Sequence, residues 1–330
     1  MAITLAEMKV GLSDKVFSQI VDIFLRESEV LQMLPFDNCV SPQGGSTLTY
    51  SYIQKKLPSV AAFRALNTEY TANHATIEKK SADLKIFGGS FDIDRVMKQA
   101  EGPFNNMAFQ IREKVLGAIS LFHYTMINGN SATTATEFDG LDKMLTGTSS
   151  EFGTGAAIDV STMANLKTNS DQLYEALQLL IKNTNADALL MNSSMIAKLQ
   201  TMARILGYKT DSEEAFGRKV TSMDGVRFMD LGNHYTVSGS AAVSTACVKA
   251  GLNRTIGSAA TTGLTDIYAV KFDVNDGFHA ASLTGNGVLH HYLPDFNTPG
   301  AVKKGEVEMV AATVLKNTAN AGVLRNIKIA

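Results

Sequence analysis

The chain has 330 residues, 45% of them hydrophobic, and a formal net charge of −2 at pH 7. This length is ample for a buried core and indicates one large domain or two linked domains. The charge excludes the basic composition typical of tight nucleic-acid binders, no apolar run reaches the length of a membrane span, and we expect no secretory signal in MAITLAEMKVG. The cysteines Cys39 and Cys247 lie far apart without metal or redox spacing, which indicates a reducing compartment.

Residues 1–36 carry apolar side chains at helical spacing, namely Val16, Phe17, Ile20, Ile23 and Phe24. This pattern is typical of a core helix, and it equally suits an arm that packs on a neighbouring copy. The sequence leaves both interpretations open and slightly favours the core helix.

Residues 41–75 form a long excursion. SPQGG predicts a turn, and STLTYSYIQKKL alternates like a half-exposed strand with Leu48, Tyr50 and Tyr52 on one face. No period follows Pro58, and loops of this length tend to be functional or to contact something else. The basic residues Lys55, Lys56 and Arg64 are therefore candidate contact residues, and the alternative is a solvated charged surface.

Residues 76–94 return as a strand in which Leu84 and Ile86 alternate, and Phe91 and Ile93 resume the pattern. The pair Gly88-Gly89 interrupts it, which indicates a bulge or a close backbone approach. Asp92 and Asp94 would share a face as an exposed acidic strand end.

One long amphipathic helix is predicted over Pro103–Gly129. Its apolar face is Met107, Ala108, Ile111, Val115, Ala118, Ile119, Phe122 and Met126, and its polar face is Asn106, Gln110, Glu113, Gly117, Ser120 and Tyr124. Pro103 suits a first-turn position and Asn128-Gly129 suits a helix end. A helix of this length needs partners along it, so we expect other elements to lie across it.

Residues 165–232 read as an α/β unit. Asn169 and Gln172 resemble a capping box before a helix with an apolar face of leucines, ADALLMN predicts a buried strand, and Asn192 or Ser193 caps a helix that ends at Gly207. A hairpin with Asp224-Gly225 at its turn follows.

The remaining chain is predicted to be mostly strand. The Ser/Ala/Gly-rich residues 238–265 read as a mobile loop, TDIYAVKFD as a strand, and residues 288–292 as a short strand. The tail contains a long strand that is apolar on both faces from Val310 to Leu315, which predicts burial on both sides.

Sequence motifs of catalysis are missing. There is no phosphate loop, dinucleotide fingerprint, nucleophile elbow or metal-ligand spacing, and the adjacent His290 and His291 would face opposite sides of a strand. His123 reads as a packed histidine of the long helix. We therefore expect no enzyme, with no catalytic, cofactor or metal residues.

Taken together, the organisation resembles the major capsid proteins of tailed bacteriophages, the Hong Kong 97-like fold. The resemblance rests on an ordered set of strings, namely ESEVLQMLPF, ADLKIFGGSFDID, INGN…EFDGL, NADALLMNSSMIAKLQTMARIL, GRKVTSMDGVRFMDLG, TDIYAVKFDVNDG and VEMVAATVLKNTANAGVLRNI. No single string is diagnostic, and the set covers nearly the whole chain.

The resemblance implies an α+β fold in five parts. These are an N-terminal arm (1–40), an extended β-loop lying over a neighbouring subunit (41–86), a peripheral domain with the long spine helix (87–154), an axial α/β domain (155–302) and the C-terminal strand of the peripheral domain (303–330).

The implied function is that of a major head protein, which assembles through pentamers and hexamers into an icosahedral shell around double-stranded DNA. Its partners would be other copies of itself, together with separate scaffold, portal and decoration proteins where these are needed, and neither sequence-specific DNA binding nor a membrane is implied. The protein would be assembled in the host cytoplasm and reside in the virion.

Two variations within the family concern this chain. Because family-like sequence begins almost at residue 1, we expect no built-in scaffold. A cross-link between neighbours would use Lys55 or Lys56 and Asn317, with Glu306 or Glu308 nearby, but these positions match no motif, so none is expected.

Three alternatives stay open: an encapsulin-type nanocompartment shell, a soluble α/β enzyme or ligand-binding protein, and a decoration or tail-tube protein. The enzyme reading explains residues 165–232 but leaves the long excursion and the long helix unexplained, and tail-tube proteins are usually smaller and mostly β.

Overall fold

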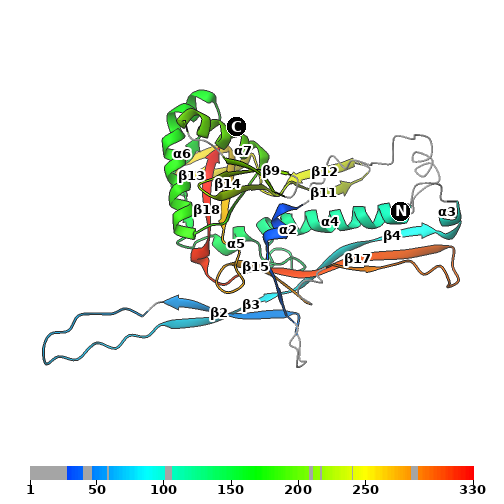
Figure 1. Cartoon of the computed structure of the whole chain (residues 1–330), viewed down its shortest axis with the longest axis horizontal. Coiled ribbons are helices and arrows are strands. Elements are labelled where there is room, and N and C mark those ends of the chain that lie inside the picture. Colours follow the sequence, from blue (N-terminus) through cyan, green and yellow to red (C-terminus); the bar gives the residue numbers. More distant parts are fainter. Residues whose placement is uncertain are drawn as a thin grey trace.

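The structure is a computed structural model that describes residues 28–39, 47–57, 59–100, 106–207, 211–215, 218–239, 241–283 and 289–330. Two sheets make up its body, and a long hairpin projects from the place where they meet (Figure 1). One sheet carries helices at its outer side, and the other extends to the opposite side together with the long helix.

The helices are α2 (Glu29–Met33), α3 (Arg95–Gln99), α4 (Asn106–Asn128), α5 (Leu141–Leu145), α6 (Met163–Thr184) and α7 (Ser193–Leu206). The strands of the first half are β1 (Phe36–Asn38), β2 (Thr49–Leu57), β3 (Thr76–Asp83), β4 (Lys85–Asp94), β5 (Glu151–Phe152), β6 (Ile158–Asp159) and β7 (Ala188–Met191). The later strands are β8 (Asp211–Ala215), β9 (Arg218–Met223), β10 (Val226–Asp230), β11 (Asn233–Ser238), β12 (Ala241–Ala246), β13 (Leu252–Ile256), β14 (Ala259–Val270), β15 (Phe278–Ser282), β16 (Leu289–Tyr292), β17 (Val302–Leu315) and β18 (Ala321–Lys328).

The long helix α4 confirms the prediction, and its 23 residues span about 35 Å. Phe122 and Met126 are fully buried, and Phe87 of β4 stacks on Phe122 with ring centroids 6.0 Å apart. The predicted polar face is wrong in part, because Ser120 is buried. The physical reason is that β11 packs on this helix as well, so α4 is covered from two sides.

A five-stranded sheet runs under α4 with the order β1-β15-β17-β16, and β4 pairs with the other edge of β17. The predicted strand of residues 76–94 is two strands separated at the buried Leu84, because β3 pairs with β2 whereas β4 pairs with β17. Ile86 is consequently exposed while Phe91 and Ile93 are buried. β4 continues through Gly88-Gly89, and the predicted close approach is confirmed, since a Cβ on Gly88 would lie 1.9 Å from the carbonyl oxygen of Val307.

A nine-stranded sheet has the order β5-β18-β14-β7-β10-β9-β8, with β13 on β14 and β6 on β18. Both ends of α7 were predicted, since Asn192 caps its start and Gly207 ends it in the left-handed conformation. The predicted turn at Asp224-Gly225 is confirmed by positive φ angles at both residues.

Two predictions in this region are wrong. Residues 238–265 are mostly strand, because β12 pairs with β11 and β13 pairs with β14, and such pairing depends on partners that a local composition does not reveal. The capping box at Asn169 is also wrong. Helix α6 begins at Met163 with Thr162 as its cap, and Asn169 lies inside it, where its side chain donates to the carbonyl oxygen of Asp159.

The two sheets cross the predicted part boundaries. β15 and β16 pair in the five-stranded sheet, whereas β18 pairs in the nine-stranded sheet. The predicted burial of β17 is confirmed from Ala311 to Leu315, where every residue is buried, whereas Val310 at the start of the predicted stretch is only half-buried. The boundaries at 40, 86, 154 and 302 themselves stay predictions.

Candidate subunit-contact surfaces

The hairpin β2–β3 is the most exposed part of the described chain. Its strands pair from Thr49 opposite Asp83 to Leu57 opposite Thr76, and residues 59–75 beyond them form neither helix nor strand. Four large apolar side chains of this tip are exposed, namely Val60, Phe63, Leu66 and Tyr70. Exposed apolar side chains gathered on one projection mark an interaction site.

The tip is tied together by its own side chains. The amide of Asn73 brackets Val60, donating to its carbonyl oxygen at 2.8 Å and accepting from its N–H at 2.9 Å. The guanidinium of Arg64 lies over the ring of Tyr70 at 5.5 Å from the centroid. Arg64, a predicted contact residue, is thus exposed at the tip. Lys55 and Lys56 lie in β2, and their side chains are outside the described part, so their contact roles stay predictions.

One face of the hairpin combines apolar and basic side chains. Ile53 pairs with Lys79 across the strands, and Ile77 lies on the same face two residues from Lys79. Ile53 and Ile77 are 66% and 67% exposed, and Lys79 is exposed too. We call these three residues the outer hairpin face. The opposite face, with Tyr52 and Gln54, is half-buried against the body.

The five-stranded sheet has one face that α4 does not cover. Val307 and Met309 of β17 are buried on the helix side, so the alternate Glu306 and Glu308 point to the other side. At the hairpin end of this face, Val310 pairs with Ile86, which is 61% exposed. We call Ile86, Glu306, Glu308 and Val310 the acidic sheet face. Sequence reasoning named its glutamates only for a cross-link and missed the face, although their spacing of two residues in a predicted strand was a usable signal.

The root of the hairpin contacts three elements of the body. The hydroxyl of Tyr50 donates to the carboxylate of Asp37 on β1, and the amide of Gln54 donates to the carbonyl oxygen of Lys316 at 3.1 Å. The ring of Tyr50 also meets His279 of β15 edge to face, with centroids 5.7 Å apart. Burial and the bond to Asp37 raise the pKa of Tyr50 well above its usual range, so the phenol remains a donor at neutral pH.

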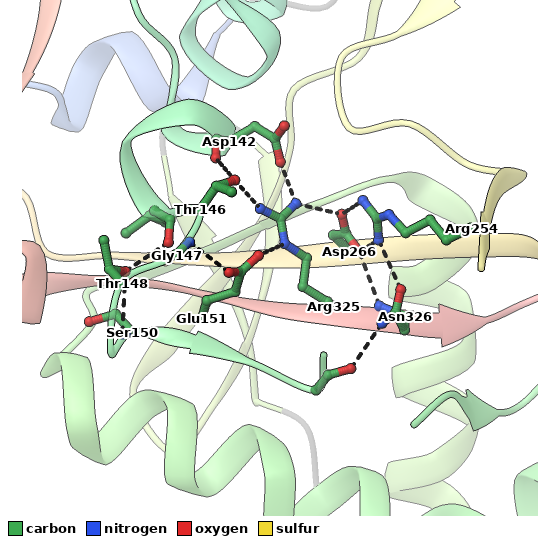
Figure 2. A network of polar contacts seen from close by, with 12 residues as sticks. Asp142, Thr146, Gly147, Thr148, Ser150, Glu151, Arg254, Asp266, Arg325 and Asn326 are labelled. Atoms are coloured by element: carbon green, nitrogen blue, oxygen red, sulfur yellow. Dashed lines mark hydrogen bonds and ion pairs between the residues drawn. The ribbon is translucent and has the colours of Figure 1, made fainter. Parts of the chain in front are cut away.

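A second polar cluster lies at the junction of α5 with the nine-stranded sheet (Figure 2). Arg325 donates to Glu151 at 2.8 Å, to Asp266 at 3.1 Å and to Asp142, and its terminal nitrogen donates to Thr146 at 3.0 Å. Arg254 holds Asp266 with two bonds of 2.5 Å. The side chains of Arg325 and Asp266 are only 7% and 3% exposed, and around them charges from five segments are paired, of which Asp142 at 45% exposure is the most accessible.

His123 of α4 is a packed histidine, as predicted. Because the carbonyl of Leu231 can only accept, Nδ1 carries the proton and donates to it at 3.2 Å. Nε2 then accepts from the hydroxyl of Ser28 at 2.8 Å, and this hydroxyl accepts from the N–H of Leu31. Burial lowers the pKa of His123 to about 4, so the ring is neutral.

The described residues show neither a metal-binding group nor a membrane-spanning helix. No group of three or more His, Cys, Asp or Glu side chains there is placed to hold a metal ion, and none of their helices has the length and apolarity to span a membrane.

Comparison with known proteins finds similarity in structure alone. No protein-family model and no curated protein matches the chain. Among solved structures, the holo-SrpI encapsulin complex from Synechococcus elongatus is similar at 12% identity and a TM-score of 0.62, covering 100% of this chain and 97% of that chain. The capsid of Myoviridae Phage XM1 is similar at 15% identity and a TM-score of 0.52, covering 98% and 99%. The capsid of the native GTA particle is similar at 13% identity and 0.52, covering 99% of both chains.

These likenesses extend over the whole chain, and the chain therefore has the Hong Kong 97-like capsid fold that the sequence predicted, in its α+β class. The neighbours are shell proteins of phage capsids and of an encapsulin.

Proposed function

We propose that this chain is a shell subunit that assembles with copies of itself. The likeness to shell proteins over the full length supports this, and so does the projecting hairpin with its exposed apolar tip. The hairpin carries the proposal, because exposed apolar side chains on a projecting arm mark a contact with another protein chain. We expect no enzymatic activity.

The direction of the hairpin favours an arrangement in which the hairpin of each copy contacts the sheet of the next copy. From the junction of the two sheets, the hairpin runs to one side and the five-stranded sheet runs to the opposite side (Figure 1). The far part of the hairpin therefore points away from its own acidic sheet face, and a copy placed alongside can receive it there. Contacts between two different surfaces generate rings when the rotation closes, which is how pentamers and hexamers form.

The two surfaces are complementary in charge and in apolar character. The outer hairpin face offers Lys79 between Ile53 and Ile77. The acidic sheet face offers Glu308 beside Ile86 and Val310, while Glu306 is already paired with Lys304 of the same face at 3.2 Å. Opposite charges across an interface fix its register and suppress wrong partners. We propose that the outer hairpin face of one copy docks on the acidic sheet face of the next, with Arg64 and the apolar tip, and with Lys55 and Lys56, adding contacts.

More specifically, we propose that the chain is the major capsid protein of a tailed phage. Its shell would assemble in the host cytoplasm and enclose double-stranded DNA in the virion. The five predicted parts keep their roles in it, with residues 1–40 as an arm and separate scaffold, portal or decoration proteins as further partners. The encapsulin likeness, at a TM-score of 0.62, supports a nanocompartment shell as the second candidate.

Electron microscopy of the purified full chain, with nuclease treatment and analysis of the contents, tests the proposal. We expect closed icosahedral shells, or pentamers and hexamers. Nuclease-protected DNA in particles from infected or induced cells supports the phage capsid, and protein cargo supports the nanocompartment. A chain that remains a monodisperse monomer or dimer with a scaffold protein present would contradict a shell role.

Charge reversal tests the docking. Lys79→Glu and Glu308→Lys should each reduce the yield of rings or shells several-fold, because like charges then meet, and the double variant should restore it. Lys182→Glu, on the exposed side of α6, is a matched control that should assemble normally. Single variants that assemble normally, or a double variant that is worse than both, would refute this contact while leaving the shell role intact.

A further inference from the structure

Among the described residues, the polar contacts from β2 of the hairpin to the body gather in one cluster at the root. Tyr50 bonds Asp37 of β1, Gln54 bonds the backbone of Lys316 just after β17, and the ammonium of Lys316 lies 5.4 Å from the centroid of the Tyr50 ring. β1 itself pairs in parallel with β15, which carries His279. The angle of the hairpin is therefore set where β1, β2, β15 and the end of β17 meet.

His279 leaves one of its hydrogen-bonding atoms unused. The side chain is fully buried, and its Nδ1 lies 3.4 Å from the carbonyl oxygen of Gly277, which can only accept, so Nδ1 carries the proton. Nε2 is then a bare acceptor, and it has no hydrogen-bond partner in the described structure. A buried acceptor without a partner costs about 1–3 kcal/mol. The nearby phenol donor, Tyr50, is used by Asp37 instead.

The charged and titratable groups that surround His279 lie on several different elements. Lys316 opposes a proton on the ring, whereas Asp37 of β1 and Asp273 before β15 favour one. Tyr50 remains a neutral phenol, and burial and Asp37 raise the pKa of the Cys39 thiol, so neither adds charge below neutral pH. Burial dominates and lowers the pKa of His279 to about 4, and the neutral ring is the form in this structure.

Asp37 is the group whose partner can change. Burial alone would raise its pKa, but the bonds from Tyr50 and from the N–H of Asn38, with the charge of Lys316, hold it below its usual value. It is thus still a carboxylate at a pH where His279 begins to take a proton. An imidazolium offers Nε2–H to that carboxylate, and a charged donor forms a stronger bond than a phenol does.

We propose that Asp37, Tyr50, His279 and Lys316 form a lock with two settings that fixes or frees the hairpin. In the closed setting, seen here, Tyr50 donates to Asp37 and His279 is neutral. In the open setting a solvent proton on Nε2 of His279 draws Asp37 away from Tyr50, and the hairpin root turns. This inference rests on the proposed function only in that the hairpin is the docking arm.

Space for the movement is present beside the lock. A cavity of about 310 Å³ separates the hairpin root from the body. The hairpin lines it with Tyr52, Gln54 and Lys80, and the body lines it with Asp139, Lys143 and Thr313. The cavity gives the root room on this side, and Tyr50 and Tyr52, which pack against the buried core, must shift when the root turns.

Linkage gives the size of the effect. In the open setting His279 donates to Asp37, which keeps its pKa at or above the ordinary 6.5, whereas in the closed setting burial lowers its pKa to about 4. Between these values each unit of falling pH favours the open setting tenfold, so the shift between them is about 300-fold. A hairpin held closed by less than this factor opens in mild acid.

Distance measurement between spin labels at Leu66→Cys and Lys182→Cys tests the lock in the full chain, diluted with unlabelled protein. Cys39→Ser removes a competing thiol and keeps its donor to the carbonyl of Thr47, and Cys247 is fully buried. We expect one narrow distance distribution at pH 7.5 and a second, separate distance at pH 4.5. Asp37→Asn should show the second distance at both pH values, and His279→Phe should show only the first.

The matched control is His291→Phe, since His291 is exposed on β16 and should keep the pH response. Identical distributions at both pH values in the parent chain, or a pH response that survives in His279→Phe, would overturn the lock. Should His279→Phe fail to fold, Asp37→Asn decides alone, because a single narrow distance at pH 7.5 in that variant also refutes it. The readout needs no shell, so an absence of shells would leave this result standing, and its failure would leave the shell role untouched.

Discussion

The two polar clusters of this chain are built in opposite ways. Around Arg325, two arginines meet three carboxylates with every group paired, and the cluster joins α5, β5, β13, β14 and β18. At the hairpin root, one phenol holds one carboxylate while a buried imidazole nitrogen has no partner among the described residues. The first arrangement leaves no polar group of the cluster unpaired, whereas the second leaves one, and this is the basis of the two settings that we propose for the root.

This difference matches the roles that the two regions would have in the proposed shell subunit. A subunit that fits positions of different curvature needs a body that does not deform and a contact arm that turns. Buried networks that are fully paired specify one structure, whereas an unpaired group lowers the cost of an alternative. The predictions below would break or sharpen this division between a rigid junction and an adjustable root.

The largest effect is expected at the junction. Arg325→Met removes the ion-pair partner of the half-buried Glu151 and one partner of the buried Asp266, and breaking a buried pair costs about 3–5 kcal/mol. We expect about 3 kcal/mol, since Arg254 still holds Asp266. Urea unfolding measures the loss, and Arg112→Met, at an exposed position of α4, should change stability by less than about 0.5 kcal/mol. A loss below 1 kcal/mol for Arg325→Met would show that the junction is not the rigid part.

Acid should act on His123 as well, because its pKa is about 4 in the fold and 6.5 when hydrated. Between these pH values the unfolded chain binds a proton that the folded chain does not, so stability falls as pH falls from 6.5 to 4, by at most about 3 kcal/mol. Comparing urea unfolding of the parent and His123→Leu at pH 7 and pH 4.5 isolates this term. An equal pH dependence in both chains would contradict the neutral, buried ring.

Two glycines give a matched pair in the region of α4 and its sheet. Gly88→Ala places Cβ 1.9 Å from a backbone oxygen of β17 and should cost about 2 kcal/mol. Gly117→Ala, in the middle of α4 with nothing within 4 Å of the new Cβ, should stabilise by about 0.5–1 kcal/mol. Thermal unfolding of both variants measures the difference, and equal effects would refute the close approach of β4 to β17.

The smallest effect on global stability is expected at the root. Tyr50→Phe removes one hydrogen bond, worth about 1 kcal/mol. Hydrogen exchange should show faster exchange in the segments around Asp37 and Tyr50 with little change in α6. A global loss as large as that of Arg325→Met would place the root within the rigid part and erase the distinction.

The sequence predicted the parts of the fold that local chemistry decides. Helix α4, the Asn192 cap, the Asp224-Gly225 turn and the two-sided burial of β17 all follow from patterns of neighbouring residues. The strands within residues 238–265 were missed because their small polar residues gain a strand conformation only from partners.

The candidate surfaces were predicted only in part. The sequence indicated the excursion at residues 41–75 by its length and its lack of a hydrophobic period. Arg64, a candidate contact residue of that excursion, is exposed at the hairpin tip. The lock was not found, because Asp37, Tyr50, His279 and Lys316 come from four elements that only the folded sheet brings together. The acidic sheet face was not predicted, because the sequence does not tell which face of the five-stranded sheet α4 covers and which face, with Glu306 and Glu308, it leaves uncovered.

The most direct test of a self-assembling subunit with a docking arm is a cryo-electron microscopy map of the assembled particle at a resolution that traces strands. We predict a closed shell in which the β2–β3 hairpin of each copy lies on the β4–β17 face of the next, with Lys79 near Glu306 and Glu308. A map in which the hairpin folds onto its own subunit or points into solvent, or a preparation that forms no assembly at all, would contradict the account.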